Sequence, residues 1–177
     1  MNKQKLSRRD FMRRSAGVAG ATLAARTILL EPRSLAAAAH AVPPSDRVRF
    51  GIIGVGMQGT GLLRNAISLP GVECVAACDL YDGRHEVARD IAGKPIATTR
   101  RYKELLDNKE IDAIINATPD HWHRQTVIDC CNAGKDVYCE KPMTHVVSEG
   151  FEMIEAAKKN NRIVQVGSQR PSSVVYA

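Results

Sequence analysis

The residues best suited to do chemistry begin with the glycine-rich stretch GVGMQG, Gly54 to Gly59. It has the spacing G-x-G-x-x-G and lies between a run typical of a strand and a run typical of a helix. In that context Gly54 permits a tight turn, Gly56 lets the backbone approach a pyrophosphate, and Gly59 allows close packing of helix on strand. The helix that opens there points free N–H groups at an anion. We therefore expect a dinucleotide phosphate to bind here, with Met57 and Gln58 among its contacts.

An acid follows the glycine stretch at a matching distance. Asp79 comes 20 residues after Gly59, at the end of the second expected strand, where a carboxylate accepts hydrogen bonds from ribose hydroxyls. Its charge repels a 2′-phosphate, which favours NAD over NADP, although Arg84 lies close enough in sequence to work against this preference. The alternative is a coincidental glycine loop followed by a capping aspartate.

A third candidate is the stretch VYCEKPM, in which an apolar strand ends abruptly. Val137 favours a strand, whereas Pro142 removes a ladder donor and constrains Lys141 to an extended backbone. The strand must therefore stop where Glu140 and Lys141 are held out at its end. Taken alone, the same pattern fits an ordinary solvated strand end.

The stretch ATPDHWH follows the fourth expected strand. Thr118 and Pro119 are expected to shape a loop near the cofactor, and Asp120 to cap the next helix. His121 and His123 are metal ligands by type, but no Cys, Asp or Glu cluster has a matching spacing, so we expect no metal. A helix-start role remains open for them, and for His123 we favour a polar contact on the cofactor side.

Apolar strand-like runs must position these loops, and they alternate with helix-like runs. The expected strands are Val48–Ile53, Val72–Cys78, Ile96–Thr98, Ile111–Ala117, Asp136–Cys139 and Ile163–Val166. The expected helices are Gln58–Ser68, Asp82–Ile91, Arg101–Asp107, Arg124–Ala133 and Ser148–Asn160. Continuous apolar strands indicate burial on both faces, so the pattern predicts an α/β fold of the Rossmann type: a doubly wound parallel sheet with helices on both faces. We assign this domain to residues 48–170, after a linker at 42–47.

Composition narrows the functional class. The chain has 177 residues, 44% of them hydrophobic, and a formal charge of +6. Residues 1–41 hold eight Lys and Arg against two acids, which leaves 17 of each in the remainder. The basic charge therefore belongs to the N-terminal segment and does not indicate nucleic-acid binding. The five cysteines have no metal-site spacing, and we interpret all of them as structural thiols.

The N-terminal segment, residues 1–41, has the features of an export signal. Paired Arg8 and Arg9 lie in SRRDFM, a stretch rich in small residues follows, and AHA ends at Ala41 as a cleavage site. Arg26 and Glu31 interrupt a weakly apolar stretch, so we expect no stable membrane span. The expectation is a twin-arginine signal peptide and a periplasmic location; an uncleaved amphipathic helix is the alternative.

In this order, GVGMQG, Asp79, ATPDHWH, CEKP and VQVGSQR resemble the Gfo/Idh/MocA family of NAD(P)-dependent oxidoreductases, and the resemblance runs from Val48 to the end. It implies that Lys141 is the catalytic residue and also a cofactor contact: it lies beside the nicotinamide, and it hydrogen-bonds and polarises the reacting hydroxyl of the substrate. An ammonium there stabilises a developing alkoxide during hydride transfer, and the hydride chemistry belongs to the cofactor. It also implies that Glu140 contacts the cofactor side and that Pro142 sets the bend.

The family pattern breaks at the C-terminus. Similar proteins continue into a second α/β domain that forms much of the substrate pocket, whereas this sequence stops at Ala177, with residues 171–177 as the start of the connection. One reading is the N-terminal part of an exported dehydrogenase of a sugar or polyol, active in its full-length form. A non-catalytic NAD-binding module is a second reading, and an NAD-dependent glycoside hydrolase is a third. The resemblance also implies homo-oligomers formed through the second domain.

Overall fold

The computed structural model describes residues 42–169. The expected signal segment, residues 1–41, and the expected connection, residues 171–177, lie outside this range, as does Arg170. The segment expected as a linker contains one turn of 3-10 helix, η1, Pro44–Asp46, before the first strand.

Strands and helices alternate along the described residues. The strands are β1 (Val48–Ile53), β2 (Val72–Cys78), β3 (Ala97–Thr99), β4 (Ala113–Asn116), β5 (Asp136–Cys139) and β6 (Val164–Val166). The helices are α3 (Met57–Ile67), α4 (Asp82–Ala92), α5 (Tyr102–Asp107), α6 (Asp120–Asn132) and α7 (Glu149–Lys159).

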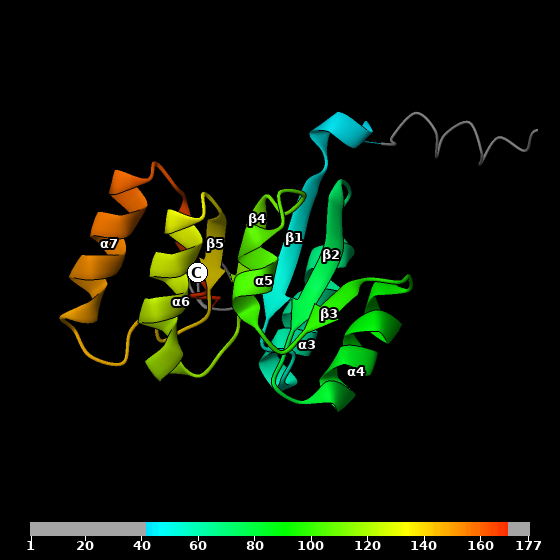
Figure 1. Cartoon of the computed structure of the whole chain (residues 1–177), viewed down its shortest axis with the longest axis horizontal. Coiled ribbons are helices and arrows are strands. Elements are labelled where there is room, and N and C mark those ends of the chain that lie inside the picture. The colour runs from blue at the N-terminus through cyan, green and yellow to red at the C-terminus, as the bar shows by residue number, and fades with distance from the viewer. Residues whose placement is uncertain (1–41, 170–177) are drawn as a thin grey trace, which may run out of the picture. The chain divides into compact units, whose positions relative to one another are not determined.

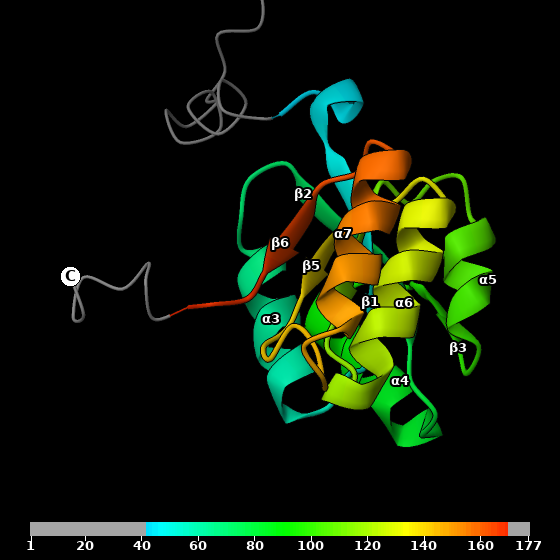
Figure 2. The same ribbon diagram turned by 90° about the vertical axis from the view of Figure 1, so that its left-hand side faces the viewer.

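The six strands form one parallel sheet in the order β3-β2-β1-β4-β5-β6. Helices α3 and α4 lie on one face, and α5, α6 and α7 lie side by side on the other (Figures 1 and 2). This confirms the predicted doubly wound α/β fold. Its chain order reverses between β1 and β4, and ligands of such sheets bind at that point, beyond the carboxyl ends of the strands.

Two apolar cores, one on each face, explain why the strands are continuous hydrophobic runs. On the face of α3 and α4, Phe50 and Ile52 of β1 pack with Leu63. On the opposite face, Ile53 and Ile114 pack with side chains of the other three helices. A strand covered on both sides buries consecutive residues, so its hydrophobicity does not alternate.

Helix α6 begins earlier than the sequence predicts. It starts at Asp120, not at Arg124, so that His121 and His123 belong to its first turn. Pro119 is the N-cap, with extended backbone angles, and its carbonyl accepts from the N–H of Trp122 at 2.9 Å. The expected cap by Asp120 is therefore wrong: its Oδ1 accepts from the adjacent N–H of His121 instead, at 2.8 Å. Its charge still suits the positive end of the helix.

The five cysteines are all free and buried, as the interpretation as structural thiols requires. Burial raises the pKa of the Cys74 thiol to about 11 and of Cys78 and Cys139 to about 12. Because the thiolate is the reactive form, these side chains act as small apolar residues of the core.

Candidate functional site

The glycine loop joins β1 to α3 at the carboxyl edge of the sheet. Gly54 has a φ of +88°, and a Cβ there would lie 2.6 Å from the carbonyl oxygen of Ala117. At Gly59 a Cβ would lie 2.0 Å from the carbonyl oxygen of Gly54. At Gly56, the N-cap of α3, a Cβ would meet nothing within 4 Å. The first and third glycines therefore serve the fold of the loop, whereas the second leaves the start of the helix open to a ligand.

Asp79, directly after β2, is hydrogen-bonded to this loop. Its Oδ2 accepts from the backbone N–H of Val55 at 2.8 Å, and its Oδ1 accepts from the N–H of Tyr81 at 3.0 Å. Each carboxylate oxygen retains a further lone pair. The side chain is half-buried and held at the wall of a cleft, where it can accept hydrogen bonds from a diol.

A cleft of about 840 Å³ runs along this edge of the sheet. Seven of the expected cofactor contacts line it: Gly54, Gly56, Met57, Gln58, Asp79, Thr118 and Pro119. They come from the ends of β1, β2 and β4, which are neighbours in the sheet although far apart in sequence. The remaining four expected contacts, Gly59, His123, Glu140 and Lys141, do not line this cleft.

His123 is buried, with 1% of its surface exposed, and holds two loops together. Its Nδ1 lies 2.7 Å from the carbonyl oxygen of Pro142, and its Nε2 lies 2.8 Å from the carbonyl oxygen of Thr118. Both ring nitrogens are therefore engaged by the backbone. The geometry favours a positioning role over the expected polar contact with the cofactor, because this side chain joins the loop after β4 to the loop after β5.

Glu140 is likewise buried, at 3% exposed, and lies behind the cleft wall. Its Oε1 accepts from Nε2 of Gln58 at 2.8 Å and from Nε2 of Gln169 at 2.6 Å, and its Oε2 accepts from the N–H of Lys141 at 3.0 Å. Gln58 lines the cleft, so Glu140 is one hydrogen bond away from it. In this structure Glu140 is linked to the cleft through Gln58 and accepts from the backbone N–H of Lys141.

Lys141, the second residue after β5, is exposed, and its peptide bond to Pro142 is cis. Within residues 42–169 no side chain or carbonyl forms a hydrogen bond or ion pair with its ammonium. The ammonium is therefore available to an oxygen atom of a ligand beside β4 and β5. Such an arrangement stabilises negative charge as it develops on that oxygen.

Asp120, His121 and His145 form an exposed group at the start of α6. The Nδ1 of His145 lies 3.2 Å from Oδ2 of Asp120, and this contact is the main cause that lowers the pKa of the aspartate. Nδ1 of His121 lies 3.6 Å from the other oxygen. In the part of the chain that the structure describes, no cluster of three or more His, Cys, Asp or Glu is arranged to hold a metal ion.

Sequence reasoning missed one wall of the cleft. Arg100, Arg101, Tyr102 and Lys103, which follow β3, line it beside Asp79, and Trp122 lines it from α6. Arg84, which the sequence singled out, does not line it. Their place directly after a strand could have indicated this wall, because the residues after β3 lie at the same edge of a parallel sheet as those after β1 and β2.

Residues 48–168 match a family described as an oxidoreductase family with an NAD-binding Rossmann fold, GFO_IDH_MocA. A glycosyl hydrolase family 109 protein of Shewanella pealeana is 31% identical over 175 residues, covering 89% of this chain and 38% of that protein.

Two solved structures are also similar to the chain. One is a myo-inositol 2-dehydrogenase from Lactobacillus plantarum, with a TM-score of 0.68 and 35% identity over 72% of this chain and 38% of that one. The other is the WlbA dehydrogenase from Chromobacterium violaceum in complex with NADH and UDP-GlcNAcA, with a TM-score of 0.66 and 25% identity over 74% and 38%. The chain thus spans less than two fifths of the length of these proteins.

Proposed function

Since the chain belongs to the Gfo/Idh/MocA family of oxidoreductases and carries its NAD-binding Rossmann domain, we propose that NAD binds in the cleft between the glycine loop and Thr118. We further propose that the full product of the gene transfers hydride between a sugar or polyol hydroxyl and the nicotinamide. NADP is the less favoured cofactor.

One observation carries the cofactor assignment: the hydrogen bond of 2.8 Å that joins Asp79 to Val55 in the glycine loop. It sets a ribose-binding carboxylate beside a helix start that Gly56 leaves open, in a cleft large enough for part of a dinucleotide. The bound cofactor supplies the hydride acceptor. The residues of this chain bind it, orient it and, at Lys141, hold a positive charge for the reacting oxygen.

The intrinsic fluorescence of the chain can be used to measure this binding, because its single tryptophan, Trp122, lines the cleft. Reduced nicotinamide absorbs where tryptophan emits, so NADH bound in the cleft should quench the fluorescence of Trp122 and show sensitised emission.

Gly56→Val should weaken NADH binding about a hundredfold, because the valine side chain would occupy the space of the pyrophosphate. This corresponds to a loss of about 3 kcal/mol of binding free energy. Thermal unfolding should be close to that of the wild type, since a Cβ there meets nothing within 4 Å. Wild-type affinity in the variant would contradict the proposed phosphate site.

A second candidate function is supported by the similarity to the glycosyl hydrolase family 109 protein. In that case the cofactor would be oxidised and reduced again within one turnover, and the net reaction would be hydrolysis of a glycoside. The full gene product, incubated with NAD and either inositols and hexoses or aryl glycosides, separates the two. Accumulating NADH supports the dehydrogenase, and released aglycone without NADH supports the hydrolase.

We also propose export through the twin-arginine route, supported by the Arg8-Arg9 pair and by the A-x-A sequence that ends at Ala41. Among the described residues no helix is both long enough and apolar enough to cross a membrane. Changing both arginines to lysine keeps the charge and should retain the precursor in the cytoplasm. Intact mass spectrometry of exported and cytoplasmic fractions checks this, because the exported wild type should begin at Val42. Export of the lysine variant at the wild-type level would argue against this route.

A further inference from the structure

We propose that Asp82 makes the cleft selective against a 2′-phosphate by neutralising Arg100, a cation of the cleft wall that directly follows Thr99, whose carbonyl accepts from the N–H of Asp79 at 3.2 Å. The inference rests on the proposed binding of NAD, and concerns how NADP is excluded. One part of that exclusion is Asp79, whose carboxylate is proposed to bind the ribose. The second part is Asp82, because it is paired with Arg100, the arginine that a 2′-phosphate would otherwise bind.

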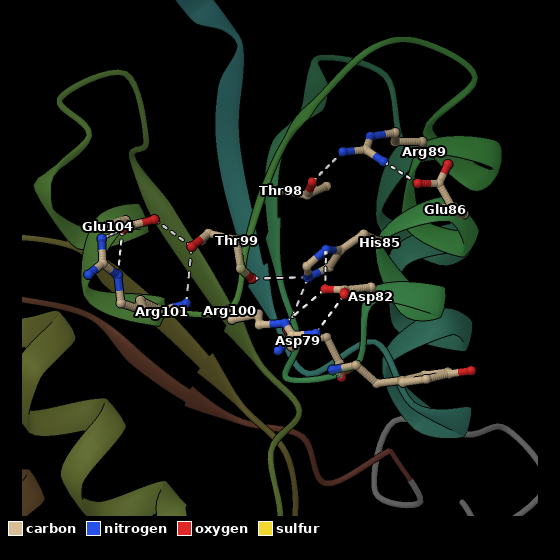
Figure 3. Close-up of polar contacts among 11 residues, drawn as sticks. Asp79, Asp82, His85, Glu86, Arg89, Thr98, Thr99, Arg100, Arg101 and Glu104 are labelled. Carbon is tan, nitrogen blue, oxygen red and sulfur yellow. Dashed lines mark hydrogen bonds and ion pairs between the residues drawn. The ribbon is translucent and has the colours of Figure 1, made fainter.

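The pair of Asp82 and Arg100 has the geometry of a two-pronged ion pair. Nε of Arg100 donates to Oδ1 of Asp82 at 2.8 Å, and Nη2 donates to Oδ2 at 2.5 Å (Figure 3). Arg100 follows β3, whereas Asp82 begins α4, so the pair spans the two segments that flank the end of β2. Two of the five N–H donors of the guanidinium, one on Nε and one on Nη2, point at the carboxylate, in the side-by-side arrangement that would otherwise bind a phosphate.

His85 fixes this pair relative to the ribose-binding acid. It is 8% exposed, and its Nε2 lies 2.9 Å from the carbonyl oxygen of Asp79 and 3.1 Å from that of Thr99. Its Nδ1 lies 3.7 Å from Oδ1 of Asp82. One imidazole therefore contacts the end of β2, the end of β3 and the start of α4, and Figure 3 shows these groups gathered together.

The other cations of this wall also face acids. Arg101 is paired with Glu104, which in turn accepts from Thr99. Lys103 lies 3.7 Å from Asp129. Each basic residue that lines the cleft in the described part of the chain therefore has a carboxylate partner. Among them, Arg100 is the residue that directly follows β3.

The charges of Asp79, Asp82 and Arg100 determine how strongly the cleft disfavours NADP. Asp82 and Arg100 are 67% and 60% exposed, so the ion pair itself adds little stability and opens at small cost. A 2′-phosphate that took over Arg100 would leave the carboxylate of Asp82 unpaired beside it, in addition to Asp79. The hydrogen bond from Arg100 lowers the pKa of Asp82, so this acid stays charged at neutral pH. NAD carries no phosphate at this position and does not meet the conflict.

The test compares NADH and NADPH binding through the emission of Trp122. Asp82→Asn keeps the shape of the side chain and removes its charge, so NADPH affinity should rise about tenfold relative to NADH, with NADH affinity within about twofold of the wild type. Adenosine 2′,5′-bisphosphate, used as a competitor, should gain by the same factor over AMP. Glu86→Gln is the matched control, because Glu86 pairs with Arg89 on the same helix and neither residue lines the cleft. It should leave the ratio unchanged.

A second substitution shows whether Arg100 is the group released. Arg100→Gln combined with Asp82→Asn should remove the gain in NADPH affinity. An Asp82→Asn protein that binds NADH normally but keeps the wild-type ratio would overturn the inference and leave the proposed function standing. A wild-type protein that binds neither nucleotide would instead overturn the proposed function.

Discussion

Gly59→Ala is expected to destabilise the folded domain by about 3 kcal/mol, the upper part of the range for overpacking a tightly packed position. The added Cβ would lie 2.0 Å from the carbonyl oxygen of Gly54 and 3.0 Å from its carbonyl carbon. These atoms are backbone, so no rotamer change relieves the clash, and α3 must move away from the end of β1. That movement would also disturb the proposed phosphate site. Urea unfolding followed by circular dichroism measures the free energy of unfolding.

Gly61→Ala is the matched control for this substitution. It lies two residues further along α3, is exposed, and its Cβ would meet nothing within 4 Å. Alanine is favoured over glycine inside a helix, so this variant should be more stable than the wild type by about 0.5–1 kcal/mol. If the free energy of unfolding of Gly59→Ala equalled that of Gly61→Ala, the close approach of α3 to the end of β1 would be contradicted.

Lys141→Ala is expected to lower turnover about a thousandfold in the full gene product while NADH binding stays within about twofold. The ammonium follows the end of β5 and has no partner among the described residues, and its loss would remove the positive charge that the proposed function assigns to the reacting oxygen. NADH affinity is spared because the side chain does not line the cleft of the glycine loop. Turnover with NAD and an inositol or hexose is measured alongside the quenching of Trp122.

Lys159→Ala supplies the control for the loss of a lysine. This residue is exposed in the last turn of α7 and lies outside the cleft, so turnover should not change. A Lys141→Ala enzyme with turnover near that of Lys159→Ala would remove Lys141 from the mechanism. Loss of NADH binding together with turnover would show instead that Lys141 acts on the cofactor.

Much of the fold follows from local sequence patterns. The bounds of Val48–Ile53, Val72–Cys78 and Asp136–Cys139 agree between prediction and structure. The first two bury consecutive residues, because a strand covered on both faces stands out as an apolar run between polar ones. The start of α6 does not follow in the same way. Residues 120–123 have no strong helix propensity, yet the helix begins there, with the carbonyl of Pro119 accepting from the N–H of Trp122.

By itself, then, the sequence determined the alternation of strands and helices, the glycine loop of Gly54 to Gly59 and the acid Asp79 that follows it. These features are local or separated by one helix and one strand, so spacing alone predicts them. Only the tertiary structure decided that Glu140 bonds Gln58 across 82 positions, that His123 joins two loops, and that Arg100 faces Asp82. Those contacts depend on the order of strands in the sheet and on side-chain directions, which bring distant segments together at one edge and which no local pattern encodes.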